Sequence, residues 1–109
     1  MNFICLVQQG AAAGPVRTRL EAGLTQLAAQ QFPGSGEACS FVWMEVAAGC
    51  GFTAGQPTTA AIAAATVPTG TNNEVRSRFL GGLCYLWVRE TGCSVDDILA
   101  TAFDEDRIP

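Results

Sequence analysis

The sequence predicts a single α/β (α+β) domain over residues 1–109, built from a duplicated β-α-β unit, with four strands in one sheet and two helices on one of its faces. The segment VRTRLEAGLTQL at residues 16–27 returns as VRSRFLGGLCYL at residues 75–86, which indicates an internal repeat. An apolar run precedes this segment in both halves, and the chain length suits one hydrophobic core. The two units span about 1–57 and 58–109.

The first unit reads as strand, helix and strand. A strand over residues 2–8 would carry apolar side chains on both of its faces, and this pattern predicts a strand from Asn2 to Gln8. Pro15 fits the first position of a helix that runs to about Gln31, and the run from Phe32 to Gly36 ends it. A strand follows from Ser40 to Val46, and the glycine-rich stretch 47–57 predicts a loop or a short hairpin.

The second helix has a start signal and a stop signal. Thr71-Asn72-Asn73-Glu74 matches a capping box, in which the Thr hydroxyl and the Glu carboxylate accept hydrogen bonds from unpaired backbone N–H groups. The helix then runs to about Glu90, where Thr91-Gly92 closes it. Residues Ile98 to Phe103 form the last predicted strand.

The segment TTAAIAAATVP at residues 58–68 is ambiguous, because alanine favours helices and is depleted in strands. The duplication favours a strand. Gly10 ends the first strand eight residues after Asn2, and Gly70 lies eight residues after Ile62. We therefore predict that Ile62 to Val67 is the first strand of the second unit.

The predicted strands carry apolar side chains on both faces, as strands do when both sides of the sheet are buried. In the second strand, for example, Phe41 and Trp43 alternate with Val42 and Met44. Right-handed crossovers place both helices on the same face. We therefore expect other copies of the chain to cover the second face.

Composition excludes several classes of function. Ten acidic residues against six dispersed arginines give a net charge of −4, which argues against nucleic acid or an anionic membrane as a partner. The five cysteines contain no C-x-x-C and the chain has no His, so we expect no metal and no cofactor. Free thiols, no basic leader and no apolar stretch of about 20 residues predict a soluble, cytoplasmic protein.

Nearly the whole chain resembles the tautomerase superfamily, which includes 4-oxalocrotonate tautomerase and macrophage migration inhibitory factor. The resemblance lies in a strand that begins at residue 1, the glycines Gly10 and Gly70 that end the repeated strands, the helix, and the pattern MEVAAGCGFTAGQP at residues 44–57. It implies a homotrimer of two-unit chains. It also implies an isomerase or related proton-transfer activity on a small keto or enol carboxylate compound.

The residue at the family's catalytic position differs. Enzymes of the superfamily use an amino-terminal proline as base or nucleophile, and the matching residue here is Met1. An α-amine has an ordinary pKa of about 7.7 to 8.0, so the amine of Met1 is the candidate catalytic base or Schiff-base nucleophile. The resemblance also matches Phe52 to an aromatic residue of the family's pocket. Positions that match the family's arginines hold Ala11, Thr71 and Ser40.

Arg76 and Arg17 recur in the two units and are the candidates for binding a substrate. Arg17 falls in a first helical turn, where the helix dipole opposes a cation by about 0.3 to 1 kcal/mol, so its presence indicates an anion or a partner. A surface or inter-subunit salt bridge is the alternative role. Two functions stay open: an enzyme with an altered site, and a non-catalytic trimeric homologue with a ligand-binding or structural role.

Overall fold

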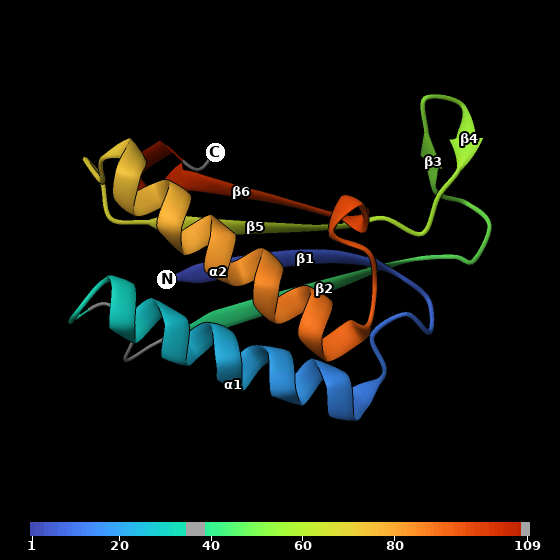
Figure 1. Cartoon of the computed structure of the whole chain (residues 1–109), viewed down its shortest axis with the longest axis horizontal. Helices are drawn as coiled ribbons and strands as arrows, with labels where there is room; N and C mark the ends of the chain where they lie inside the picture. Colours follow the sequence, from blue (N-terminus) through green and yellow to red (C-terminus); the bar gives the residue numbers. More distant parts are fainter. Residues whose placement is uncertain (35–38, 108–109) are drawn as a thin grey trace.

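The computed structural model describes residues 1–34 and 39–107, and it shows one sheet whose two helices lie on the same face (Figure 1). The sheet strands run in the spatial order β2-β1-β5-β6. The helices and strands are β1 (Asn2–Gln8), α1 (Gly14–Gln31), β2 (Ser40–Val46), β3 (Phe52–Thr53), β4 (Gln56–Pro57), β5 (Ala61–Val67), α2 (Asn73–Thr91) and β6 (Ile98–Asp104). The α+β class, the four-stranded sheet and the placement of the helices are thereby confirmed.

The two β-α-β units meet at the centre of the sheet. Strand β1 pairs in parallel with β2, and β5 pairs in parallel with β6, as each crossover helix requires. Strands β1 and β5 are antiparallel, with Phe3 opposite Ala65 and Leu6 opposite Ile62. The duplication is therefore arranged as a pseudo-twofold around the β1–β5 pair.

The alanine-rich segment is a strand. The repeat predicted this, whereas the helix propensity of alanine favoured a helix. Ala63 and Ala65 have no exposed surface, and they belong to the same buried cluster as Phe79 and Leu83 of α2. Small side chains on β5 leave room for these larger ones above them. Packing and sheet pairing therefore outweigh the intrinsic preference of alanine, which amounts to a few tenths of a kcal/mol per residue.

The start of α2 differs from the predicted capping box. The N-cap is Asn72, whose side-chain oxygen accepts a hydrogen bond from the backbone N–H of Val75 at 2.9 Å. The Thr71 hydroxyl instead donates to the carbonyl of Pro68 at 2.6 Å. Asn is at least as good an N-cap as Thr, so the helix begins one residue later than expected. The predicted stop is confirmed, because Gly92 adopts a left-handed conformation with φ of 74°.

The glycine-rich stretch contains the short hairpin that was one of its two predicted forms. Strands β3 and β4 pair antiparallel, and Ala54 and Gly55 between them have positive φ values of 51° and 79°. Two consecutive positive φ values are typical of the tightest hairpin turns. Helix α1 ends with Phe32 as its C-cap residue. Ser35 and Gly36 of its predicted stop lie outside the described residues.

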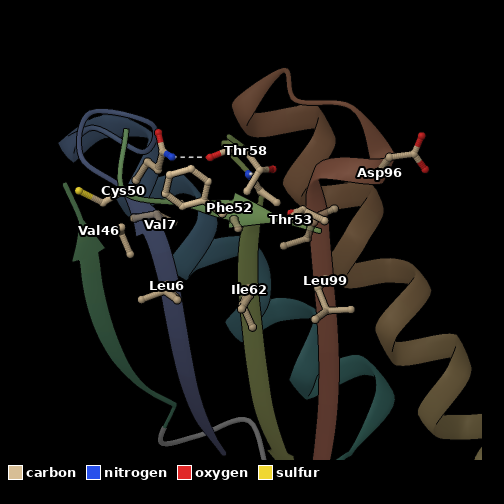
Figure 2. Close-up of a pocket in the computed structure, with 15 residues that line it drawn as sticks. Leu6, Val7, Val46, Cys50, Phe52, Thr53, Thr58, Ile62, Asp96 and Leu99 are labelled. Atoms are coloured by element: carbon tan, nitrogen blue, oxygen red, sulfur yellow. Dashed lines mark hydrogen bonds between the residues drawn. The ribbon is translucent and has the colours of Figure 1, made fainter. Parts of the chain in front are cut away.

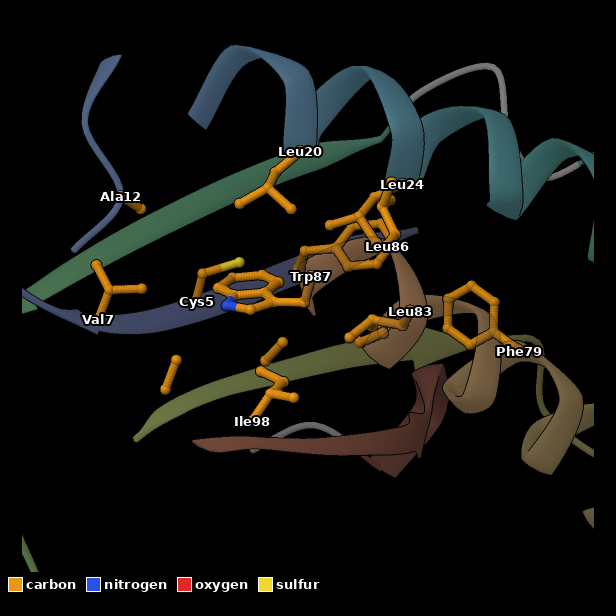
Figure 3. Close-up of a cluster of buried hydrophobic side chains, with 14 of the residues drawn as sticks. Cys5, Val7, Ala12, Leu20, Leu24, Phe79, Leu83, Leu86, Trp87 and Ile98 are labelled. Atoms are coloured by element: carbon orange, nitrogen blue, oxygen red, sulfur yellow. The ribbon is translucent and has the colours of Figure 1, made fainter. Parts of the chain in front are cut away.

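The core lies between the sheet and the two helices (Figure 3). Leu20 and Leu24 of α1 and Leu83 of α2 are fully buried over β1 and β5. The helices approach each other closely because Gly23 faces Leu86, where an added Cβ would lie 2.7 Å from a methyl carbon. None of the helices in residues 1–34 and 39–107 is long and apolar enough to cross a membrane.

The other face of the sheet carries large apolar side chains that no helix covers. The exposed ones are Ile4, Val42, Met44, Ile62, Leu99 and Phe103. We call these six residues the open face. Contiguous exposed apolar surface of this kind marks an interaction site rather than a solvent-facing surface.

Candidate functional site

Met1 is fixed at one end of the central pair of strands. Its carbonyl accepts a hydrogen bond from the backbone N–H of Ser40 at 3.1 Å, and its partly buried side chain packs against the core. The β1–β5 register, extended to the strand ends, places Met1 beside Val67, which is paired with Asp104. The amino terminus is therefore held at one end of the sheet, next to the start of β1, and we call this end of the molecule the Met1 end.

A row of polar side chains crosses the sheet at the Met1 end. The Ser40 hydroxyl donates to the side-chain oxygen of Asn2 at 2.6 Å, and the backbone N–H of Asn2 donates to the hydroxyl of Thr66 at 2.8 Å. Thr66 is the buried member, with 5% of its surface exposed. Because side chains alternate along a strand, these three lie on the same face as Ile4 and Met44. We call Ser40, Asn2 and Thr66 the polar row.

Arg76 lies at this same end, on the first turn of α2. Its guanidinium group donates to the carbonyl of Ala102 at 2.7 Å, to the carbonyl of Thr71 at 3.0 Å and to the carboxylate of Asp104 at 2.8 Å. The group therefore joins the start of α2 to the end of β6. Arg76 thus forms a partly buried salt bridge within one chain, whereas the alternative considered from the sequence was a surface or inter-subunit salt bridge.

Arg17 lies at the opposite end of the sheet. Its guanidinium group is 3.0 Å from the carboxylate of Glu45 at the end of β2, and it stacks 4.7 Å from the ring centroid of Trp43. The Trp43 indole N–H in turn donates to Glu21 at 2.7 Å. Arg17 is thus held by β2, and a cation over an indole face is a favourable contact worth about 0.5 to 1 kcal/mol at a partly exposed site.

Phe52 is on the hairpin, also at the end opposite Met1, and 61% of its surface is exposed. It borders a pocket of about 490 Å³ on the open face, whose floor is formed by Leu6, Ile62 and Leu99 of neighbouring strands (Figure 2). The Gln8 side chain holds the hairpin base by donating to the carbonyl of Thr58. We call this the hairpin pocket.

One chain therefore brings together only part of the predicted site. Met1 and Arg76 share the Met1 end, where β5 separates them, whereas Arg17 and Phe52 lie at the other end of the sheet. Phe52 can reach the Met1 end only from another copy of the chain.

The cysteines have different environments. Burial, followed by the nearby charge of Glu21, raises the pKa of Cys5 from 9.0 to about 12. Burial likewise raises the pKa of Cys84. Cys50 is an exposed free thiol at the mouth of the hairpin pocket. In the described part of the chain, no group of three or more cysteine and carboxylate residues could hold a metal ion.

Sequence reasoning missed the polar row and Asp104. The members of the polar row are scattered in the chain, and only the order and register of the strands bring them side by side. A signal for Asp104 was present, because the offset that relates Arg17 to Arg76 also relates Glu45 to Asp104. Extending the repeat into the strand ends would have found both ion pairs.

Solved structures with this arrangement include fused 4-OT proteins and a member of a dehalogenase family. Native Ps01740 matches with a TM-score of 0.90 at 21% identity over 100% of this chain and 95% of that chain. The Q0 fused 4-OT symmetric trimer matches with a TM-score of 0.85 at 18% identity. The match covers 100% of this chain and 86% of that chain. N1, a member of the cis-3-chloroacrylic acid dehalogenase family, matches with a TM-score of 0.86 at 12% identity. The match covers 100% of this chain and 79% of that chain. No family model and no curated protein matches the sequence.

These likenesses, together with the duplicated β-α-β topology, show that the chain has a tautomerase-like α+β fold. The fold predicted from the repeat and from the glycine-rich pattern is confirmed. The similarity extends over the full length of the chain, so both units belong to the shared fold.

Proposed function

We propose that the chain is a homotrimeric tautomerase-superfamily protein that catalyses proton transfer on a small keto or enol compound, with the α-amine of Met1 as the base. The observation that carries this proposal is the position of Met1. The residue directly precedes the central strand β1 and adjoins the polar row, at one end of the face that carries the open-face residues. The amine is therefore tied to a fixed place in the fold.

Assembly into a trimer is supported by two features of the chain. The open face needs a cover, and the hairpin that carries Phe52 projects beyond the sheet (Figure 1). A hairpin of two short strands is marginally stable alone and gains from contact with another surface. The Q0 fused 4-OT with this fold is a symmetric trimer. In the proposed trimer, an inter-subunit cavity forms at the Met1 end of one copy, and Phe52 of another copy is part of its wall.

The chemistry that an amine supplies at such a site is proton abstraction next to a carbonyl. The amine takes the proton from the carbon atom beside the carbonyl group, and the C–H electron pair forms the carbon–carbon double bond. The carbonyl oxygen takes up the negative charge and then receives the proton back from the ammonium group. Keto and enol forms interconvert without any co-reactant.

The proposal assigns Arg76 and Arg17 to the scaffold. Both guanidinium groups are committed to a carboxylate and to further contacts in the same chain, so binding a substrate carboxylate would require an ion pair to open. The same observation favours the second candidate function, a trimeric homologue that binds a ligand without catalysis. With both arginines committed to contacts within the chain, the scaffold is intact but neither arginine is available to anchor a substrate carboxylate.

The test is solvent deuterium exchange at the α-carbon of small carbonyl compounds, followed by NMR. Intact mass first establishes that Met1 is retained with an unmodified amine. We expect exchange above the buffer rate with the native protein and loss of that rate when the α-amine is selectively acetylated. Since the chain has no lysine, the amino terminus is the one aliphatic amine available to the reagent. Exchange at the buffer rate would replace catalysis by the ligand-binding role, and exchange above the buffer rate that acetylation leaves unchanged would contradict Met1 as the base.

A further inference from the structure

We infer that the Met1 end recognises a neutral carbonyl compound through the N–H and O–H donors of Asn2 and Thr66, rather than a carboxylate through arginine. This inference rests on the proposed proton transfer at Met1 and names its substrate class. Three observations carry it: the placement of the polar row, the donor capacity of its members, and the pairing of the arginines.

The polar row is confined to one end of the sheet. Across the uncovered face, the polar row is followed first by Val42, Ile4 and Ala64, and then by Met44, Leu6 and Ile62. On β2, β1 and β5 the face thus changes from polar to apolar within one row, while β6 places Phe103 beside Thr66 and Thr101 beside Ala64. Because Asn2 directly follows Met1, the hydrogen-bonding groups lie beside the proposed base, at the end of the sheet opposite the hairpin pocket.

Among the described residues, Thr66 and Asn2 retain donors after their own hydrogen bonds are counted, whereas Ser40 donates its one O–H to Asn2. Thr66 accepts from the Asn2 backbone, and a hydroxyl that accepts still carries one O–H donor. The Asn2 side chain accepts the Ser40 hydroxyl at its oxygen, which leaves the two N–H donors of the amide group. These are neutral donors, and they suit a carbonyl oxygen.

The arginines with described side chains are paired with acidic groups. Each lies within 3.2 Å of a carboxylate oxygen, and they are Arg17, Arg19, Arg76, Arg78 and Arg89. At the Met1 end itself, the charge of Arg76 is offset by Asp104 and its donors are shared with two backbone carbonyls. A substrate carboxylate placed here would compete with Asp104 for the same cation, whereas a neutral carbonyl compound would not.

Neutral donors also suit the reaction. Negative charge develops on the carbonyl oxygen as the α-proton leaves, and fixed N–H or O–H donors aimed at that oxygen stabilise it. Thr66 is held by the Asn2 backbone and Asn2 by Ser40, so both donors are already oriented before a substrate arrives. Removal of one such donor from a catalytic site typically lowers the rate by about 10²- to 10³-fold.

The experiment compares two substrates that share a benzyl group. Phenylacetaldehyde is neutral, and phenylpyruvate carries a carboxylate. For the native protein, we expect deuterium exchange at the benzylic carbon with a kcat/KM that is higher for phenylacetaldehyde by about tenfold or more. Thr66→Val removes the hydroxyl and keeps the shape, and we expect it to lower that value about 10²-fold or more. Thr66→Ser keeps the hydroxyl and should restore most of the rate.

Thr101→Val is the matched control. It removes a hydroxyl from the same face in the neighbouring row, where the Thr101 Oγ1 atom is buried and has no hydrogen-bond partner among the residues that the structure describes. Its rate should stay within about twofold of the native value, because this hydroxyl is bonded to neither Asn2 nor Thr66. If Thr66→Val does not fold by circular dichroism, Asn2→Ala replaces it as the donor-deletion variant, with the same expected loss.

The outcomes separate the inference from the proposed function. A higher kcat/KM for phenylpyruvate, or a donor-deletion variant as active as Thr101→Val, overturns the neutral-substrate inference and leaves proton transfer at Met1 standing. Exchange at the buffer rate with both substrates overturns both. A kcat/KM that is higher for the aldehyde, that Thr66→Val lowers about 10²-fold or more and that Thr101→Val leaves within about twofold of the native value supports both.

Discussion

The guanidinium group of Arg76 lies 2.8 Å from the carboxylate of Asp104, and this ion pair repeats in the second unit the 3.0 Å pair of Arg17 with Glu45 in the first. In both units the arginine is on the first turn of the helix and the acid is at the end of the strand that follows it. Each pair therefore closes its β-α-β unit by joining the start of the helix to the far end of its second strand. The repeated arginines are explained by the architecture.

These two pairs should differ in strength. Arg76 has two additional hydrogen bonds to backbone carbonyls, whereas Arg17 has its stacking contact with Trp43. In double-mutant cycles of the free energy of unfolding, we expect a coupling of about 1 kcal/mol or less for Arg17–Glu45, because the Glu45 side chain is 46% exposed. We expect Arg76→Ala alone to cost more than Arg17→Ala, since it leaves two backbone carbonyls without this donor. Urea unfolding measures both, and equal costs would contradict a special role for Arg76.

Helix packing predicts opposite effects for two glycine substitutions. An added Cβ at Gly23 would meet Leu86 at 2.7 Å, whereas an added Cβ at Gly81 meets nothing within 4 Å. Gly81→Ala should therefore stabilise the protein by about 0.5 to 1 kcal/mol through helix propensity. Gly23→Ala should be neutral or destabilising, because Leu86 has to move. Thermal denaturation of the two variants gives the comparison, and a stabilisation of equal size in both would show that the helices are not in close contact at Gly23.

Thiol chemistry should distinguish Cys5 from Cys50. Burial holds the pKa of Cys5 at about 12 in the folded state against 9.0 for an ordinary thiol, so Cys5 stays protonated when the protein is folded. Its contribution to stability is complete below pH 9.0 and is lost as the pH rises toward about 12, because the unfolded chain ionises first. A disulfide reagent at about pH 8 should modify the exposed Cys50 rapidly and Cys5 only after denaturation. Mass spectrometry of the labelled peptides reports both, and rapid modification of native Cys5 would contradict its burial under the helices.

Much of the fold was available from the sequence. The bounds of β1 and β2 followed from apolar periodicity, and β5 was found because the repeat spacing from Gly10 to Gly70 outweighed alanine's helix preference. Local capping signals predicted the start of α2 less well, because two residues that are good N-caps stand next to each other there. Thr71 and Asn72 can both cap a helix, and the backbone geometry selects Asn72.

The candidate site was less accessible to sequence reasoning than the fold. Repetition selects residues that the scaffold needs twice, and the two repeated arginines close their units in the same way. Residues that serve one site need not repeat. At the spacing of the two strand-ending glycines, the counterpart of Asn2 is Ile62 and the counterpart of Thr66 is Leu6, and both are apolar. Asn2 and Thr66 meet only through the antiparallel pairing of β1 with β5, which no spacing in the sequence reveals.

Only a second copy of the chain can bring Phe52 to the Met1 end, so the proposed site depends on the open face being buried between copies. Sedimentation equilibrium at micromolar concentration measures this. We predict a single species with three times the 11.4 kDa mass of the chain. A stable, folded monomer at that concentration would contradict both the trimer and the site built across its interface.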